Sequence, residues 1–199
     1  MKIAPRLIAA SAFACATCPI SAQVFDNGDP SGGFGTTVLS ERDSSNQVAD
    51  DFVLTGDETA GHLQWWGSGA GSAFELRIFA SELGTPDDTP LHTIDLGTVV
   101  GSTVNFGGQD IFEYNAGFSP IVLGNGDYLL SIVETTPGND WFWSASCEDG
   151  CEGESWRRDD DAGSWESGNW QFAFVLDVPE PGTGALAAIG ALLLGRRRR

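Results

Sequence analysis

Residues 74–80 read Phe74-Glu75-Leu76-Arg77-Ile78-Phe79-Ala80. Successive side chains of an extended chain point to opposite faces, so Phe74, Leu76 and Ile78 share one face. Glu75 and Arg77 share the other. This period of two predicts an antiparallel β-strand that buries its apolar face and leaves its charged face half-solvated.

The same alternation recurs between residues 23 and 178. It is clear again in Trp170, Phe172, Phe174 and Leu176. Asn125-Gly126, between the apolar runs 121–123 and 128–133, predicts a tight hairpin. Further strands are expected at 47–54, 62–67, 91–99, 111–115 and 141–143.

Roughly nine or ten short strands without an amphipathic helix predict an all-β fold, in which two antiparallel sheets pack as a β-sandwich or jelly-roll-like single domain. Residues 144–168 form the longest stretch without strand character and are rich in Asp, Glu, Gly and Ser. We expect them to form a long acidic loop, because such a segment in a compact domain is usually functional or disordered.

The two ends of the chain differ from the body. Lys2 and Arg6 precede an apolar run, and small residues follow it near Ala22. This pattern predicts a secretory signal peptide at 1–22. The β-sandwich domain is then expected at 23–177, and residues 178–199 form a separate tail.

The body is strongly acidic. Of the 28 acidic residues only Glu180 lies outside residues 23–178, which leaves 27 against four arginines, a net charge of −23 with no lysine. Phosphate backbones and anionic lipids repel such a body, so nucleic-acid binding and adhesion through a basic patch are excluded.

Two cysteines remain in the exported body, in Cys147-Glu148-Asp149-Gly150-Cys151. A close pair in an oxidising compartment predicts a local Cys147–Cys151 disulfide. The alternative is a metal site that includes His62 and His92, but the spacing departs from zinc motifs.

The tail combines three features in a fixed order. Pro179-Glu180-Pro181 is followed by an apolar run at 185–194 and by four basic residues, Arg196, Arg197, Arg198 and Arg199. Two prolines hold an extended backbone that suits an enzyme cleft, and the arginines are expected to stay on the cytoplasmic side.

This tail closely resembles the PEP-CTERM sorting signal of Gram-negative bacteria. The resemblance implies that an exosortase, a membrane-embedded processing enzyme, reads Pro179, Glu180 and Pro181 while the apolar segment and arginines position the substrate. It also implies an inner-membrane intermediate, followed by the cell surface or extracellular matrix. As a short apolar helix, residues 182–195 would span about 21 Å of a hydrocarbon core about 30 Å thick, which suits a transient membrane segment.

Candidate binding residues in the body are aromatic or acidic. Exposed tryptophans form glycan platforms, and the candidates are Trp65, Trp66, Trp141 and Trp143. Calcium prefers oxygen ligands, and Asp159, Asp160 and Asp161 offer them outside any EF-hand pattern. A solvated acidic surface is the alternative for these aspartates.

No nucleophile elbow, metalloprotease motif or phosphate-binding loop occurs in the sequence. Their absence favours a non-catalytic protein without an obligatory cofactor. The resemblance of the tail further implies an exported protein that associates with exopolysaccharide. The alternatives are a purely structural acidic coat component and a secreted glycan-cleaving enzyme. Exposed tryptophan pairs would favour glycan binding, and buried ones would favour the structural role. A cleft with converging carboxylates would favour the enzyme.

Overall fold

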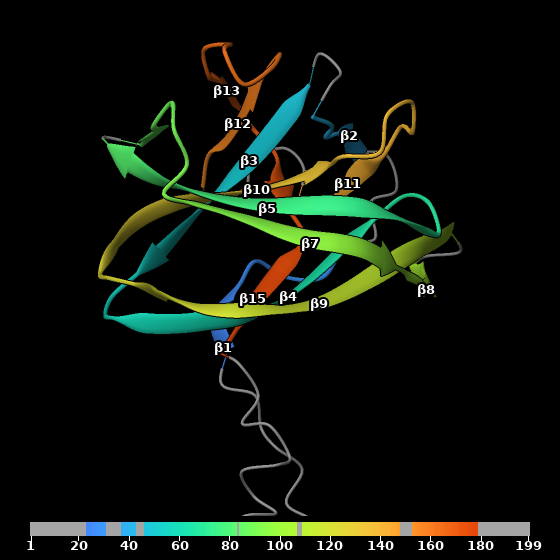
Figure 1. The fold of residues 1–199 in the computed structure, drawn as a ribbon, viewed down its shortest axis with the longest axis horizontal. Helices are drawn as coiled ribbons and strands as arrows, with labels where there is room; N and C mark the ends of the chain where they lie inside the picture. The colour runs from blue at the N-terminus through green and yellow to red at the C-terminus, as the bar shows by residue number, and fades with distance from the viewer. Residues whose placement is uncertain are drawn as a thin grey trace, which may run out of the picture.

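The computed structural model describes residues 23–30, 37–42, 46–82, 84–106, 109–147 and 153–178. These residues form fifteen strands in two antiparallel sheets, and they contain no helix (Figure 1). The prediction of an all-β fold with two antiparallel sheets is confirmed. The expected signal peptide at 1–22 and the expected apolar helix of the tail lie outside the described residues.

One sheet has eight strands and contains the first and last strands of the described chain. Its central strand β4 pairs with β9 on one side and with β15 on the other. The members are β1 (Gln23–Asp26), β2 (Thr37–Leu39), β4 (Glu58–Gly67), β8 (Ser102–Phe106), β9 (Gln109–Leu123), β11 (Phe142–Cys147), β14 (Gln171–Phe172) and β15 (Phe174–Asp177).

The other sheet has seven strands. Its central strand β10 pairs with β3 and β5, and β12 and β13 extend the edge beyond β3. The members are β3 (Gln47–Leu54), β5 (Gly71–Glu82), β6 (Thr85–Pro86), β7 (His92–Val100), β10 (Gly126–Glu134), β12 (Ser155–Arg158) and β13 (Glu166–Gly168).

The predicted strands are all present, and the Asn125-Gly126 turn joins β9 to β10 as the sequence indicates. The expected loop at 144–168 is wrong. That segment continues β11 to Cys147 and contains β12 and β13, which pair with each other. Short strands with charged residues escape the pattern because too few apolar positions repeat within them.

The core lies between the sheets and is built largely of aromatic rings. Trp65 of β4 stacks on Tyr114 of β9 with ring centroids 5.3 Å apart. Phe74 of β5 meets Trp65 edge-on at 5.4 Å, which joins the two sheets. Such offset and edge-on pairs add to the free energy of burial and fix the sheets against each other.

Candidate functional site

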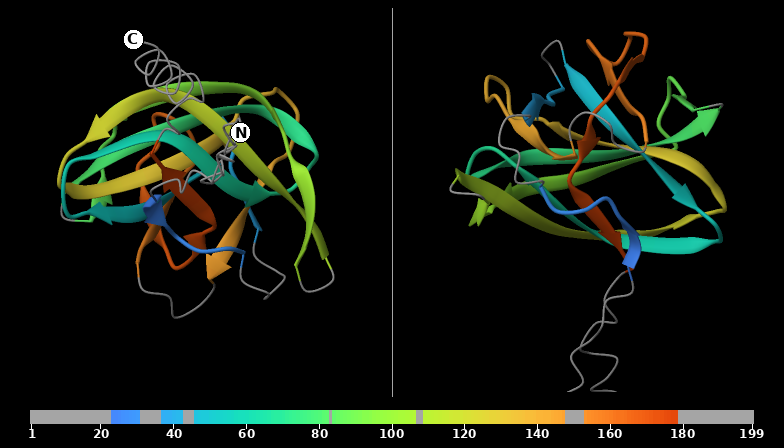
Figure 2. Two further views of the ribbon diagram at one scale, coloured as in Figure 1. Left: turned by 90° about the horizontal axis from the view of Figure 1, so that it is seen from below. Right: turned by 180° about the vertical axis from the view of Figure 1, so that it is seen from behind.

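The first and last described strands leave the domain side by side. Gln23 of β1 lies opposite Asp177 of β15, and β15 pairs in turn with β4 (Figure 2). The described chain ends at Val178, one residue before the predicted motif. Pro179, Glu180 and Pro181 lie outside the described residues, as do Arg196, Arg197, Arg198 and Arg199. The sheet therefore fixes the point from which the tail begins.

The outer surface of the eight-stranded sheet surrounds this point. We call it the basal face. Residues paired across neighbouring strands point to the same side of a sheet, so the strand register shows which side chains share the basal face. They are His62, Gln64 and Trp66 of β4, Glu113 and Asn115 of β9, and Val175 and Asp177 of β15.

A pocket of about 560 Å³ opens on the basal face between β1, β4 and β15. Trp66 and Val175, which are both buried, form its apolar part. The polar lining comes from Gln23, Asp26, Gly28, Asp29, Gln64 and Asp177.

The polar groups of this pocket are held by local hydrogen bonds. The Gln23 amide donates to Asp26 Oδ2 at 2.9 Å, and the Gly28 N–H donates to Asp26 Oδ1 at 2.8 Å. Gly28 has a φ of +82°, which favours glycine at this turn. His62 Nδ1 lies 3.5 Å from Asp177 Oδ2. The pocket thus offers fixed carboxylates that can receive cationic or hydrogen-bond-donating groups.

The arginines of the body lie at the other sheet. Arg77 is on β5, and Arg157 and Arg158 are on β12. Arg42 donates its backbone N–H to Glu134 of β10 and its guanidinium to Glu75 of β5. Among the described residues, the basal face therefore carries carboxylates and no arginine.

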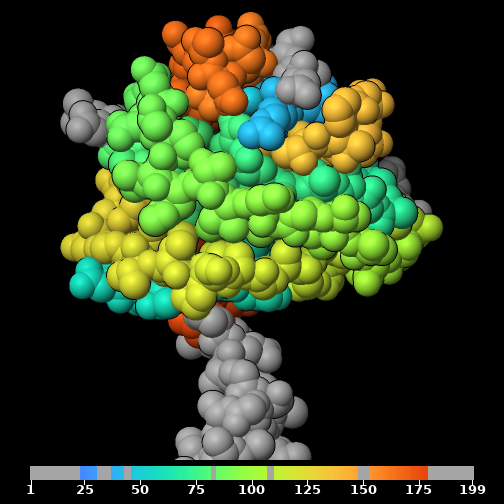
Figure 3. Space-filling view, viewed as in Figure 1, coloured from blue at the N-terminus to red at the C-terminus, as the bar shows by residue number. Residues whose placement is uncertain are grey.

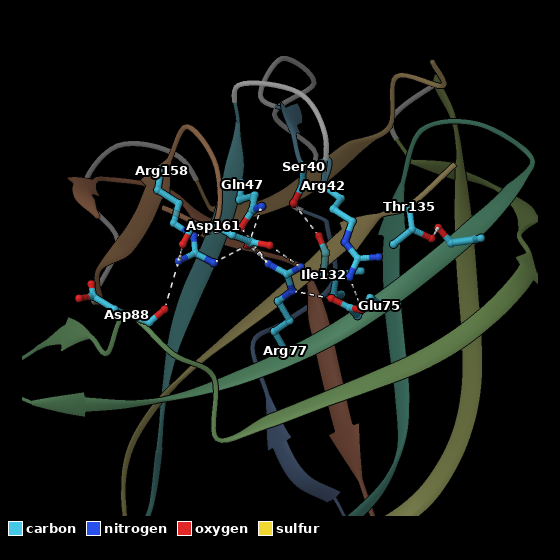
Figure 4. Close-up of polar contacts among 11 residues, drawn as sticks. Ser40, Arg42, Gln47, Glu75, Arg77, Asp88, Ile132, Thr135, Arg158 and Asp161 are labelled. Atoms are coloured by element: carbon cyan, nitrogen blue, oxygen red, sulfur yellow. Dashed lines mark hydrogen bonds and ion pairs between the residues drawn. The ribbon is translucent and has the colours of Figure 1, made fainter. Parts of the chain in front are cut away.

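We call the outer surface of the seven-stranded sheet the apical face. It carries a buried charge network (Figure 4). Arg77 Nε donates to Glu75 at 2.6 Å and its Nη1 donates to Gln47 at 3.1 Å. Arg77 and Arg158 also both donate to the carboxylate of Asp161. Arg77 and Arg158 are only 4% and 3% exposed, so the expectation of a half-solvated charged face on β5 is wrong.

Aromatic rings complete the cover of the apical face. The Arg158 guanidinium lies 4.5 Å from the ring centroid of Trp165 and 5.5 Å from that of Phe79. Trp156 and Trp165 pack against Ala49, Phe79 and Leu129 of the same face. The segment between β12 and β13 thus covers part of this face, and the hairpin lies at the end of the molecule opposite the β1–β15 exit (Figure 3).

The protonation of the network follows from its contacts. Partial burial alone would raise the pKa of Asp161, but hydrogen bonds from Arg77 and Gln47 and the charges of both arginines hold it below its usual value. Burial lowers the pKa of Arg158, and the charge of Asp161 opposes this shift. The carboxylate of Asp161 therefore balances the charges of Arg77 and Arg158.

These contacts give no support to the calcium site at Asp159, Asp160 and Asp161, which stays a prediction. Asp161 is taken up by Arg77 and Arg158, and Asp160 Oδ1 accepts from the Ala162 N–H at 2.8 Å. Within the described residues, no three His, Cys, Asp or Glu side chains are grouped so that they could hold a metal ion. His62 and His92, of the alternative metal site, lie on strands of different sheets.

The tryptophan platform is contradicted. Trp65, Trp66, Trp141 and Trp143 are between 0% and 2% exposed. Trp143 donates its indole N–H to the Ala173 carbonyl at 3.0 Å and stacks on Phe172 with centroids 4.7 Å apart. Trp65, Trp141 and Trp143 fill the space between the sheets, whereas Trp66 is buried on the basal face against Ala173 and Val175. The sequence pattern does not distinguish such packing from sugar binding.

A buried aspartate links the two sheets. Asp50 of β3 accepts hydrogen bonds from Asn27, from the Phe172 N–H and from the Asp51 N–H. Its side chain is fully buried, and this burial raises the pKa of Asp50 well above its usual value despite those bonds. Asn27 follows β1 and Phe172 is in β14, so the hydrogen bonds of Asp50 connect β3 of one sheet to the strands of the other sheet.

A second pocket of about 290 Å³ lies beside Asp51 on the apical side. Its lining includes the carboxylates of Asp51, Asp127 and Glu154 together with Tyr128. Burial raises the pKa of Asp51, and the charges of Glu154 and Asp127 add to the effect. The Glu154 N–H donates to Asp51 Oδ1 at 2.9 Å.

Cys147 ends β11, whereas Cys151 lies outside the described residues. The Cys147–Cys151 disulfide stays a prediction. In the part of the chain that the structure describes, no helix has the length and apolar character needed to cross a bilayer.

Residues 177–199 match the family model of the PEP-CTERM protein-sorting motif, which confirms the resemblance of the tail. The motif implies an exported protein that an exosortase processes at the membrane on its way to the cell surface or extracellular space. No curated protein matches the chain.

The basal pocket had no signal in the sequence, because its residues come from three separate segments that only the sheet register brings together.

Proposed function

We propose that this exosortase-sorted protein is a non-catalytic, acidic component of the cell surface or extracellular matrix, which associates with exopolysaccharide through charge and bridging cations. The observation that carries this proposal is the distribution of charge. Two of the four arginines of the body, Arg77 and Arg158, are buried. The other two, Arg42 and Arg157, pair with Glu75 and Glu166 at 3.1 and 3.0 Å.

The two exposed arginines, Arg42 and Arg157, are thus each paired with a carboxylate, and the body keeps a large excess of negative charge. A surface of one sign repels itself and attracts counter-ions, which suits a hydrated coat that divalent cations cross-link. The burial of Trp65, Trp66, Trp141 and Trp143 supports this reading over a lectin-like one, because stacking on sugars needs accessible rings.

The test uses the purified exported protein and the exopolysaccharide of its host, titrated by calorimetry. We expect association in millimolar calcium that is lost in chelator and weakened by added salt, since screening acts strongly on exposed charges. Saturable binding in chelator that resists salt would contradict the proposal and favour a lectin.

A second candidate function is glycoside cleavage. The observation in its favour is the pocket lined by Asp51, Asp127 and Glu154, because a carboxyl group with a raised pKa next to a second carboxylate is the usual machinery of glycosidases. Release of reducing ends from the exopolysaccharide, lost in Asp51→Asn, would establish this function in place of the first. We expect no release.

A further inference from the structure

We propose that the basal pocket is a docking surface for the exosortase, which receives cationic side chains from the enzyme's extracytoplasmic side. This inference rests on the sorting of the chain by that enzyme and adds a second point of recognition beyond the Pro-Glu-Pro motif. It is argued from the distance between motif and sheet, from the shape of the face and from its charge.

The distance is short. Pro181 is three residues beyond Val178, so even a fully extended chain carries it only about 11 Å from the end of the sheet. A domain of 100 residues already has a radius of gyration of about 13 Å. An enzyme whose cleft holds Pro179, Glu180 and Pro181 must therefore bring the surface around that cleft against the domain.

The sheet determines which part of the domain the enzyme meets. Asp177 is held between His62 of β4 and Gln23 of β1, so the tail begins within the rim of the basal pocket. The pocket of about 560 Å³ is a concave surface at the place where contact is enforced. Its lining also includes Asp26, the last residue of β1, and Asp29, in the segment that follows β1.

The charge of the face selects the chemistry of the partner. Asp26, Asp29 and Asp177 line the pocket and Glu113 lies on the same face, with no arginine among its described residues. An anionic lipid surface would repel this face. Lysine or arginine side chains of a protein would be attracted, and complementary charge of this kind mainly raises the rate of encounter.

The experiment follows removal of the tail from the full-length chain in exosortase-producing cells, by pulse labelling and mass. The test variant is Asp29→Asn/Asp177→Asn. The matched control is Asp140→Asn/Asp159→Asn, which removes two exposed carboxylates, one before β11 and one after β12, neither of which lines the basal pocket. We expect processing of the test variant to slow by about three- to tenfold and the control to keep the wild-type rate.

A second basal variant guards against loss of folding. Gln64→Lys adds a cation to the pocket without removing a carboxylate, and it is expected to slow processing by a similar factor. The thermal midpoint of each exported variant is measured beside its rate. Basal variants that fold normally and are processed as fast as wild type, or faster, overturn the proposal.

A linker variant tests whether enforced contact is the cause. Ten Gly and Ser residues inserted between Val178 and Pro179 let the enzyme reach the motif without touching the sheet. The basal substitutions should then have little effect on the rate, and an undiminished effect would also overturn the proposal.

Failure of sorting itself has a different signature. Pro179→Ala/Glu180→Ala/Pro181→Ala should leave the tail in place. If this variant were processed normally, the sorting function would be wrong. If it stays unprocessed while the basal variants behave as wild type, sorting stands and only the docking surface is refuted.

Discussion

The apical face of the seven-stranded sheet is covered around Arg77 and Arg158, whereas the basal face of the eight-stranded sheet has an open pocket between β1, β4 and β15. Arg77 and Arg158 on the apical face are 4% and 3% exposed beneath Asp161 and Trp165. On the basal face, Gln23, Asp29 and Asn115 are exposed and His62 is half-buried. Both faces carry polar residues at alternate positions of their strands. The difference teaches that the buried charges around Arg77 and Arg158 serve the fold, while the carboxylates of the basal pocket lie where a partner can reach them.

Arg77→Met is the strongest way to break this comparison. The substitution leaves Glu75, which is 7% exposed, without its closest cation, and removes one of the two donors to Gln47 Oε1, the other being the Nε–H of Arg158. Removal of one partner of a buried ion pair costs about 3–5 kcal/mol. We expect a loss of that size in the free energy of unfolding, measured with urea.

The matched control for Arg77→Met is Arg157→Met. Arg157 pairs with Glu166 at 3.0 Å, but the two side chains are 54% and 68% exposed. Exposed pairs contribute about 0–1 kcal/mol. Equal losses in the two variants would mean that burial does not separate these arginines and that the apical network has no special role in the fold.

The next test concerns the cover of the apical face. Trp165→Ala removes the ring that lies over Arg158 and the edge-on contact with Phe79, whose centroid is 5.4 Å away. An aromatic pair and a cation–π contact together contribute about 2 kcal/mol. We expect a loss of that size in the free energy of unfolding, and increased hydrogen exchange at the amides of β12. A change confined to the core strand β4 would contradict the assignment of Trp165 as an apical cover.

The two faces also show how far the sequence leads. Strands such as 47–54 and 74–80 were predictable, because one buried side produces a period of two. The cover of Glu75 and Arg77 was not, because alternation places side chains on a face without showing whether a distant hairpin folds over it. The prediction that Trp141 and Trp143 form a glycan platform was wrong for a related reason, because the face that two alternate residues share can be the one buried in the core. The sorting motif was fully readable, because its signal is contiguous in the chain.

The buried Asp50, between the two sheets, should make the free energy of unfolding depend on pH. Burial raises its pKa above the ordinary value of 3.8, so within the window between the two values the folded state binds more protons than the unfolded state. The free energy of unfolding must then fall as the pH rises through that window, by at most about 1.4 kcal/mol per pH unit for one group.

Urea unfolding of wild type and Asp50→Asn between pH 4 and pH 8 measures this contribution. We expect a shallower decline with pH in Asp50→Asn, while Asp140→Asn, an exposed control, keeps the wild-type slope. Parallel curves for Asp50→Asn and wild type would show that Asp50 titrates in the fold as it does in the unfolded chain.

The smallest effect is expected on the basal face. Asp29→Asn/Asp177→Asn loses the contact of Asp177 with His62, whose atoms are 3.5 Å apart and whose imidazole is 31% exposed. Such a pair contributes less than about 1 kcal/mol, and 1 M salt shortens the screening length to about 3 Å. The free energy of unfolding of this variant should therefore differ from that of wild type by less than about 1 kcal/mol at low salt, and the difference should vanish at 1 M salt. The loss in Arg77→Met should persist at 1 M salt, because buried charges are screened much less. A large, salt-resistant loss in the basal variant would make its carboxylates part of the fold, and slow tail removal in that variant could then no longer be attributed to a lost contact with the exosortase.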